Sequence, residues 1–532
     1  MKLRSCALAA AAACTLLGPA APIAAAEPGP PLPTLDWQHC GTAANVTCTK
    51  VRVPRDYDRP RGASFELFVA KSPATDQAHR IGSLFVNFGG PGNAAAGSFE
   101  ALGADLVPAL NARYDIIAMD PRGVGQSQPS IDCKADQQAD GIYAQPFTTP
   151  DDLDVRALTA KDSRYIGRCL TLNRGVLPYV STASAARDVD LIRQALGERQ
   201  ITYVGFSYGT FLGATYASLF PGNYRAMVLD GPVDANAYIN DPLRSLSAQS
   251  TAFERALGRF LQACARDQAA CRGFGGSDPG DAYDQLLDRL DATPLIAADG
   301  RAVDGDDARA VTLQALYSKA SWGFLAQALV DLQHGDGERM QRAADQFYGR
   351  NADGSFTPFY DRYFAITALE QDYPRDIGTY LRAGQRSWDE HEHFWWNDGY
   401  LQLNYGLYPV RPVDIFRGPF AVRRSSPPPL VVATTYDPAT PYRGARNLVR
   451  ELGNARLLTM RGDGHTAYGG KSACVDAAVN AYVDEGTLPP AGTQCPQDTG
   501  FGAPQPQAQA QASRAMAGVD ATGHVRLSSP LR

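Results

Sequence analysis

One stretch of the sequence, residues 202–221, constrains the fold more than any other. It reads TYVGFSYGTFLGATYASLFP, beginning like a buried strand and continuing with the periodicity of a helix. The turn between the two is Gly205-Phe206-Ser207-Tyr208-Gly209, a serine set between glycines. Small flanking residues permit a very tight turn that projects the serine side chain outward. The stretch predicts a strand–turn–helix unit that exposes Ser207 at the edge of a sheet.

Runs of apolar and β-branched residues that resemble strands recur along the chain. They occupy residues 83–88, 114–119, 201–206, 225–230, 430–435 and 455–460. Helical periodicity lies between several of them, as in 183–197 and 208–220. Alternating strands and helices indicate an α/β fold, with a mostly parallel sheet and helices on both faces.

The alternation stops after Asp230 and resumes at Leu430. The residues between read mostly as helices, for example AFERALGRFLQACA from Ala252. We therefore expect one α/β core in two parts, 40–233 and 426–495, interrupted by a helical cap. The cap is predicted to span 234–425. Ligand sites in such sheets lie beyond the carboxyl ends of the strands, so the cap is expected to shape the site.

Both ends of the chain differ in composition from the core. Residues 1–26 have a basic start, an apolar middle and a small-residue cleavage site, as a secretory signal peptide does. Residues 27–39 are rich in proline, and residues 496–532 are dominated by Gln, Ala, Pro and Gly. The sequence thus predicts a secreted protein, extracellular or periplasmic, with a low-complexity tail. No other apolar run is long enough for stable membrane insertion.

Cysteine usage agrees with export. Eight cysteines remain after the signal peptide: Cys40, Cys48, Cys133, Cys169, Cys264, Cys271, Cys474 and Cys495. None has the paired spacing of a structural zinc site, so disulfides in an oxidising compartment are the better interpretation. Sequence alone does not choose the pairing. Proximity favours joining neighbours along the chain, that is 40 with 48, 133 with 169, 264 with 271, and 474 with 495.

A serine hydroxyl needs a base to act as a nucleophile, and the chain has only seven histidines. In an enzyme with this kind of serine turn the order is serine, acid, histidine. His465 follows the strand-like run 455–460 and is the candidate base by position and by elimination. Asp437 follows the run 430–435 and is the favoured acid, which would orient the imidazole. Asp230, also at the end of a strand, is its rival.

Two backbone N–H groups are candidates for stabilising an oxyanion. One belongs to Tyr208, directly after the serine, and the other to Gly90 in the early loop NFGGPGN. That loop lacks the lysine of a phosphate-binding loop, so a nucleotide site is not expected. His391 and His393 have no evident third metal ligand. The chemistry requires no metal or organic cofactor.

Charge gives little information about partners. The net charge is −6, which argues weakly against nucleic acid or an acidic membrane surface. No feature of the sequence indicates an oligomeric state.

Taken together, the motifs resemble those of the secreted bacterial tripeptidyl aminopeptidases. The motifs are GGPG (89–92), DPRGVGQS (120–127), GFSYGT (205–210), DPATP (437–441) and GDGH (462–465). These enzymes are α/β-hydrolases related to proline iminopeptidases, and the resemblance runs from about Cys40 to Cys495. It implies a helical cap after the sixth strand. It also implies an exopeptidase that holds the free N-terminal amine of its substrate under the cap and cleaves through an acyl-enzyme.

In relatives, acidic residues of the cap bind the substrate's amine. Glu370, in AITALEQD, falls where relatives carry a short pattern with an acid, so the resemblance transfers that role to it; a surface carboxylate on a helix is the alternative. The chain also departs from the family. Ala368 stands where relatives have a cysteine, and YGLYP at 405–409 replaces the motif that contains the second cysteine of the pair in relatives. A cap disulfide of many relatives is thus absent.

The favoured hypothesis is a secreted serine exopeptidase that acts on peptides with a free N-terminus and releases short N-terminal peptides, with tripeptides as the favoured length. A secreted carboxylesterase or lipase-like hydrolase is the alternative, because ester and amide hydrolysis use the same Ser207, His465 and Asp437. A third hypothesis is a binding protein that keeps only the fold, but it predicts a degraded triad, and all three residues are present in order.

Overall fold

The computed structural model describes residues 29–103, 107–141, 143, 149–397 and 400–501. The expected signal peptide, 1–26, and the predicted tail after residue 501 lie outside this part. Ten described strands form one sheet in the order β1-β2-β3-β5-β4-β6-β7-β10-β11-β12, and β8 and β9 pair separately. From β5 to β12 all pairings are parallel; β1, β2, β3 and β5 pair antiparallel.

The strands are β1 Gln38–His39, β2 Thr47–Pro54, β3 Ser64–Ser72, β4 Gly82–Asn87, β5 Tyr114–Met119, β6 Ile201–Phe206, β7 Tyr224–Asp230, β8 Leu295–Ile296, β9 Ala302–Val303, β10 Leu430–Tyr436, β11 Arg456–Asp463 and β12 Gln494–Pro496. The α-helices are α1 Ala95–Leu102, α2 Pro108–Asn111, α3 Val155–Leu172, α4 Thr182–Ala195, α5 Tyr208–Leu219, α6 Ala235–Asn240, α7 Pro242–Arg266, α8 Pro279–Ala292, α9 Gly305–Leu316, α10 Trp322–Gln333, α11 Glu338–Tyr348, α12 Phe359–Glu370, α13 Ile377–Glu390, α14 Leu403–Leu407, α15 Tyr442–Leu452 and α16 Ala473–Glu485. Short 3-10 helices are η1 Gln77–His79, η3 Pro150–Asp152, η4 Leu177–Tyr179, η5 Lys319–Ser321 and η6 Trp395–Asn397.

The sheet buries both faces, because neighbouring residues of a strand point to opposite sides. In β6, Val204 packs in the core that includes α1 and α16, whereas Tyr203 packs in the core that includes α4, α5 and α15. In β7, Val228 and Leu229 divide in the same way. This two-sided burial explains why the central strands read as continuous apolar runs. The predicted α/β fold with a mostly parallel sheet is confirmed.

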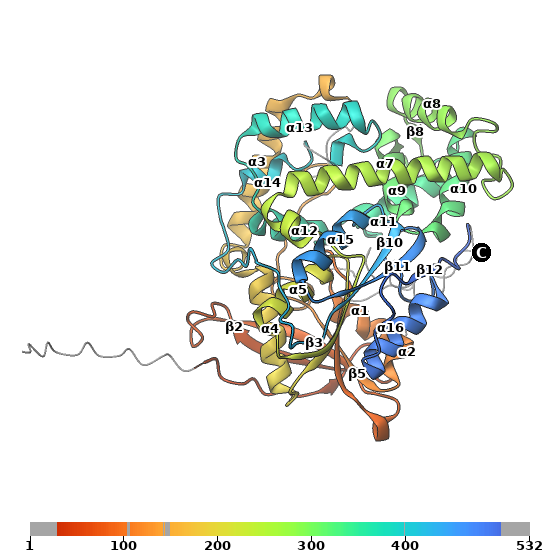
Figure 1. The fold of residues 1–532 in the computed structure, drawn as a ribbon. Coiled ribbons are helices and arrows are strands. Elements are labelled where there is room, and N and C mark those ends of the chain that lie inside the picture. Colours follow the sequence, from red (N-terminus) through yellow and green to blue (C-terminus); the bar gives the residue numbers. More distant parts are fainter. Residues whose placement is uncertain (1–28, 104–106, 142, 144–148, 398–399, 502–532) are drawn as a thin grey trace, which may run out of the picture.

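A long, mostly helical segment lies between two neighbouring strands. β7 and β10 pair in parallel, with Leu430 opposite Val228, yet the chain passes from α6 to α14 between them. If the two-residue β1 is left uncounted, β7 is the sixth strand, so the insertion stands where the resemblance placed it. Figure 1 shows its helices, in green and cyan, gathered at one end of the sheet. We call this segment the cap.

Aromatic packing occupies the part of the cap where the family disulfide was expected to be missing. Ala368 is fully buried in α12. Tyr405 of α14 packs on Phe364 of α12, with ring centroids 5.7 Å apart, and on Tyr373 at 4.6 Å. Contacts of this kind between rings add to the stability that comes from burying their area. They join α12 to α14 without a covalent bond.

The described residues contain four disulfides, and they are the pairs that proximity favours. They join Cys40 to Cys48, Cys133 to Cys169, Cys264 to Cys271 and Cys474 to Cys495. The last connects the first turn of α16 to β12, at the edge of the sheet.

Candidate active site

Ser207 occupies the tight turn between β6 and α5. Its backbone has φ 55° and ψ −125°, a region that residues other than glycine rarely adopt. A side chain at Gly205 would collide with the carbonyl oxygen of Gly209. A Cβ at Gly209 would lie 2.7 Å from the carbonyl oxygen of Asn87. The two glycines are therefore required by close packing, and the strained serine is held between them.

The loop after β4 passes directly beside this serine. A Cβ at Gly89 would lie 2.8 Å from Cβ of Ser207 and 3.2 Å from the backbone nitrogen of Tyr208. Gly89 and Gly90 have φ of 92° and 106°, and Asn87 Oδ1 accepts the N–H of Gly89 at 2.9 Å. Within the described part of the chain, the N–H groups of Gly90 and Tyr208 have no hydrogen-bond acceptor. These are the two donors expected from the sequence.

Asp437 and His465 are in direct contact. Nδ1 of His465 lies 2.9 Å from Oδ2 of Asp437, which is 1% exposed. The carboxylate also accepts the N–H groups of Ala439 and Thr440, at 2.9 and 2.8 Å, and the hydroxyl of Thr440 at 3.0 Å. A carboxylate held by so many donors is fixed in orientation, and it fixes the histidine ring in turn.

Asp230, the rival acid, serves a different purpose. It accepts the N–H groups of Ala467 and Tyr468 at 2.8 to 3.0 Å, so it anchors the chain just after His465. Burial raises the pKa of Asp230 to about 6. It makes no hydrogen bond to the imidazole.

The ring of His465 lies beside the serine turn. Ser207 N donates to the carbonyl of Asp230 at 2.9 Å, and a Cβ on the next residue, Gly231, would lie 2.9 Å from Cε1 of His465. Nε2 of His465 is buried and has no hydrogen-bond partner among the described residues. No hydrogen bond joins Ser207 to His465 in this structure. Such bonds are often long in an enzyme without substrate and shorten when it binds.

Glu370 lies inside the molecule rather than on a helix surface. It is 1% exposed at the end of α12. Oε1 accepts the N–H of Thr182 at 2.8 Å, and Oε2 accepts its hydroxyl at 2.6 Å. The same hydroxyl shares a 2.5 Å hydrogen bond with the phenol of Tyr208. Burial raises the pKa of Glu370 to about 7, although the Thr182 hydrogen bonds oppose the shift.

Two contributors to the site were missed in the sequence. Thr440 bonds to Asp437 and lies 3.3 Å from Nδ1 of His465; its place in DPATP, where a hydroxyl follows an Asp-Pro turn, was an available signal. Tyr317 of the cap accepts the N–H of His465 at its carbonyl, 2.8 Å away, and its ring meets the imidazole edge-on at 5.3 Å. No sequence pattern points to Tyr317, because it reaches the site only through the packing of the cap.

The described residues offer little to a metal ion. The one group of three potential ligands with atoms within 4.8 Å is Cys40, Cys48 and Glu100, and its cysteines are joined in a disulfide. His393 contacts Glu254 and Asp284, whereas His391 contacts Thr251. None of the helices in the described ranges has the length and apolar character needed to cross a membrane.

Comparison with known proteins shows the family to which the chain belongs. Residues 84–471 match the family described as alpha/beta hydrolase fold. The serine protease Hip1 of Mycobacterium tuberculosis is 32% identical over 483 residues, covering 87% of this chain and 91% of that protein. Carboxylesterase B of the same organism is 34% identical, covering 89% and 92%. The tripeptidyl aminopeptidase of Streptomyces coelicolor is 30% identical, covering 84% and 83%. The chain belongs to the α/β-hydrolase family and is a serine hydrolase related to these peptidases.

Proposed function

We propose that the protein is a secreted serine exopeptidase that releases short peptides, chiefly tripeptides, from unblocked N-termini. Ser207 attacks the scissile carbonyl while Nε2 of His465 takes its proton. His465 then gives that proton to the leaving amine, and an acyl-enzyme on Ser207 remains. Water, activated by the same histidine, hydrolyses the ester and frees the peptide. Asp437 holds the imidazole in the required tautomer throughout.

Negative charge that develops on the carbonyl oxygen needs donors already in place. The N–H groups of Gly90 and Tyr208 are proposed for this role, since Tyr208 follows Ser207, Gly90 follows the Gly89 that packs on Ser207, and neither group is used by a described acceptor. Removal of one such donor typically costs on the order of 100-fold or more in kcat. Because these are backbone groups, the shape of the loop at Gly89 and Gly90 determines whether they point at the substrate.

The observation that carries the exopeptidase assignment is the buried Glu370. It makes no salt bridge with a described Lys or Arg, and the more distant charge of Arg417 lowers its pKa by less than burial raises it. An incoming N-terminal ammonium would supply that partner, and its arrival would favour the ionised form of Glu370. An apolar ester would bring no positive charge to this carboxylate.

The short path from Glu370 to the nucleophile supports a short product. One threonine hydroxyl and the side chain of Tyr208, the residue after Ser207, connect them. A substrate whose amine binds Glu370 would therefore place a bond only a few residues along its chain at Ser207. The choice of a tripeptide among such short products is supported by the similarity to tripeptidyl aminopeptidase.

The experiment compares a free-amine peptide with its N-acetylated twin, using mass spectrometry of the products. Tripeptides released from the free-amine peptide alone would support the proposal. Ser207→Ala serves as the inactive control, and Glu370→Gln is expected to weaken use of the free-amine peptide selectively. Cleavage of both peptides at equal rates would contradict the role given to Glu370.

A carboxylesterase is the second candidate, favoured by the similarity to carboxylesterase B. It uses the same nucleophile, base and acid, and it differs in what the pocket accepts. Hydrolysis of a simple aryl ester with neither peptide cleaved would favour this candidate.

Secretion is part of the proposal. The four disulfides support an oxidising compartment, and residues 1–26 have the composition of a signal peptide. N-terminal sequencing of protein recovered from a culture medium or periplasm tests this directly. A mature chain that begins near Glu27 is the expected result.

A further inference from the structure

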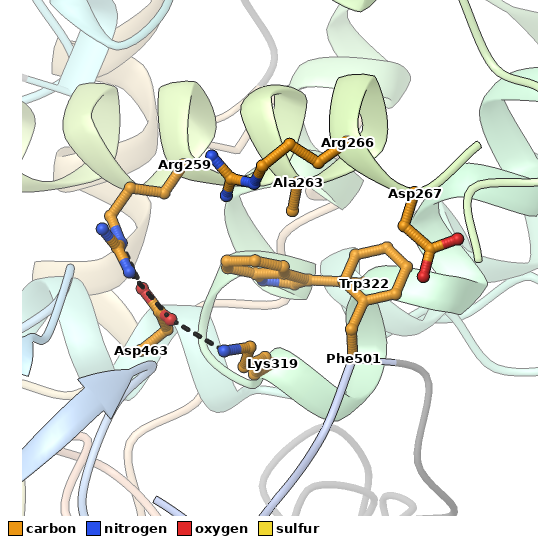
Figure 2. A pocket seen from close by; sticks show the side chains of 8 residues that line it. All are labelled: Arg259, Ala263, Arg266, Asp267, Lys319, Trp322, Asp463 and Phe501. Carbon is orange, nitrogen blue, oxygen red and sulfur yellow. Dashed lines mark hydrogen bonds and ion pairs between the residues drawn. The ribbon is translucent and has the colours of Figure 1, made fainter. Parts of the chain in front are cut away.

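A cluster of charged side chains joins the cap to the loop that carries His465. Asp463, two residues before the histidine, is 4% exposed. Both of its oxygens accept from the Arg259 guanidinium of α7, Oδ1 from Nε and Oδ2 from Nη2, the latter at 3.2 Å. Lys319 of η5 donates to Oδ2 at 3.1 Å. Figure 2 shows the three side chains converging at one end of a cavity of about 260 Å³.

The same arginine also touches the strand that carries the acid. Its guanidinium lies 3.6 Å from the centre of the Tyr436 ring, and Tyr436 directly precedes Asp437. A guanidinium over an aromatic face at this distance is attracted to it. Arg259 therefore contacts Tyr436, next to the proposed acid, and Asp463, two residues before the proposed base. It does so from α7, a helix of the cap.

Lys319 belongs to a short cap segment, residues 317–319, that packs against the loop carrying His465. Ser318 forms a β-bridge with Gly464, and the carbonyl of Tyr317 accepts the N–H of His465. Gly464 has φ 100°, and a Cβ there would lie 2.8 Å from the Tyr317 carbonyl oxygen. Only glycine permits so close an approach. Lys319 also lies over the ring of Trp322, 5.7 Å from its centre, and Phe501 packs on Trp322 from the far side of the cavity.

We infer that Arg259, Lys319 and Asp463 are positioning residues, through which the cap holds His465 and Asp437 in register with each other. This inference rests on the proposed role of His465 as the base. A histidine displaced by about 1 Å from its productive place costs on the order of 100-fold in rate. The cap is thus part of the catalytic apparatus as well as a cover over it.

The test measures how fast a fluorophosphonate probe labels Ser207, a reaction that needs the nucleophile and its base but no substrate amine. Asp463→Asn is expected to slow labelling at least tenfold. In peptide or ester turnover it is expected to lower kcat while KM changes less than twofold. Arg259→Met should slow labelling as Asp463→Asn does, and Arg259→Lys should slow it less. The double variant Arg259→Met/Asp463→Asn should label no more slowly than the slower of its two single variants, because the two residues act as one unit.

Asp345→Asn is the matched control. It breaks a two-bond pair with Arg301, at 2.5 and 2.7 Å, within the cap but away from the loop carrying His465. It should lower the melting temperature without slowing labelling. Should Asp463→Asn fail to fold, Arg259→Met and Lys319→Met decide the question. Labelling at the wild-type rate in folded variants, or equal slowing by Asp345→Asn, would overturn the inference. His465→Ala tests the proposed base separately: if it labels normally, the assignment of His465 itself is wrong.

Discussion

Glu370 accepts both hydrogen bonds that Thr182 donates, and the Thr182 hydroxyl in turn meets the phenol of Tyr208. A carboxylate in the cap is thereby connected to the residue that follows the nucleophile. If Glu370 recognises the substrate's amine, the phenol of Tyr208 is linked to the amine site through Thr182, and its backbone N–H faces the reacting carbonyl.

The pKa of Glu370 gives a pH dependence with a definite sign. Burial raises this pKa to about 7, so the carboxyl group is largely neutral below that pH and binds an ammonium poorly. We expect kcat/KM for a free-amine peptide to rise as pH increases through about 7, and to fall again above about 8 as the substrate amine loses its proton. Kinetics from pH 5 to 9 test this. An aryl ester without an amine is the control, because its acid limb reports the base alone. Glu370→Gln should make the acid limb of the free-amine peptide match that of the ester and weaken binding about tenfold to 100-fold; identical acid limbs for the two substrates in the wild type would contradict the assignment.

The serine turn leaves no room for a side chain at Gly205. Gly205→Ala would force the new methyl group against the backbone of Gly209, which cannot move without distorting β6 or α5. We expect a loss of roughly 3 kcal/mol or more of stability together with loss of fluorophosphonate labelling. Gly197→Ala is a useful comparison, since nothing surrounds a Cβ there, although its φ of 72° also disfavours alanine. If Gly205→Ala melts and labels like the wild type, the account of the turn is wrong.

We expect the stability of the cap to fall at alkaline pH, because His393 loses its proton there. Burial disfavours its charged form, but hydrogen bonds to Glu254 at 2.6 Å and Asp284 at 2.8 Å outweigh burial and raise the pKa of His393 to about 9. Its ordinary value is about 6.5, so the stabilisation is complete below that pH and is lost as pH rises through about 9. We expect about 3 kcal/mol of stability at most to disappear over this range. Thermal unfolding at pH 6.5 and 9.5 measures it, and the drop should be smaller in His393→Gln.

Much of the fold was predictable because its signals are local. Six strand-like runs correspond to β4, β5, β6, β7, β10 and β11, and the serine turn has the expected form. The runs are apolar since helices cover both faces of the sheet. β2 and β3 were not among the predicted strands. They form the antiparallel side of the sheet, where exposed Lys50 and Arg52 interrupt the apolar pattern.

The partners of the site were predictable only where they follow a strand. Asp437 comes directly after β10 and His465 comes two residues after β11, so order along the chain was sufficient. Tyr317 and Arg259 come from the cap, and their contacts depend on how its helices pack, which no local pattern encodes. The burial of Glu370 has the same origin, because α12 reaches Thr182 only in the folded chain.

Among the disulfides, the longest loop should matter most. The Cys133–Cys169 pair closes 36 residues, against 7 for Cys264–Cys271. A crosslink stabilises chiefly by restricting the unfolded chain, so its effect increases with loop length. We expect Cys133→Ala/Cys169→Ala to cost about 4 kcal/mol, and more than the Cys264→Ala/Cys271→Ala pair. Denaturant unfolding of the two double variants makes the comparison; the reverse order would show that native contacts, rather than loop closure, dominate.

The most direct test of the proposed function is the mass of what the mature enzyme releases from a free-amine peptide and from its N-acetylated twin. We expect tripeptides from the free-amine peptide, none from the acetylated one, and none from either with Ser207→Ala. Equal cleavage of both peptides, or cleavage of neither while an aryl ester is hydrolysed by the intact serine, would contradict the proposed function.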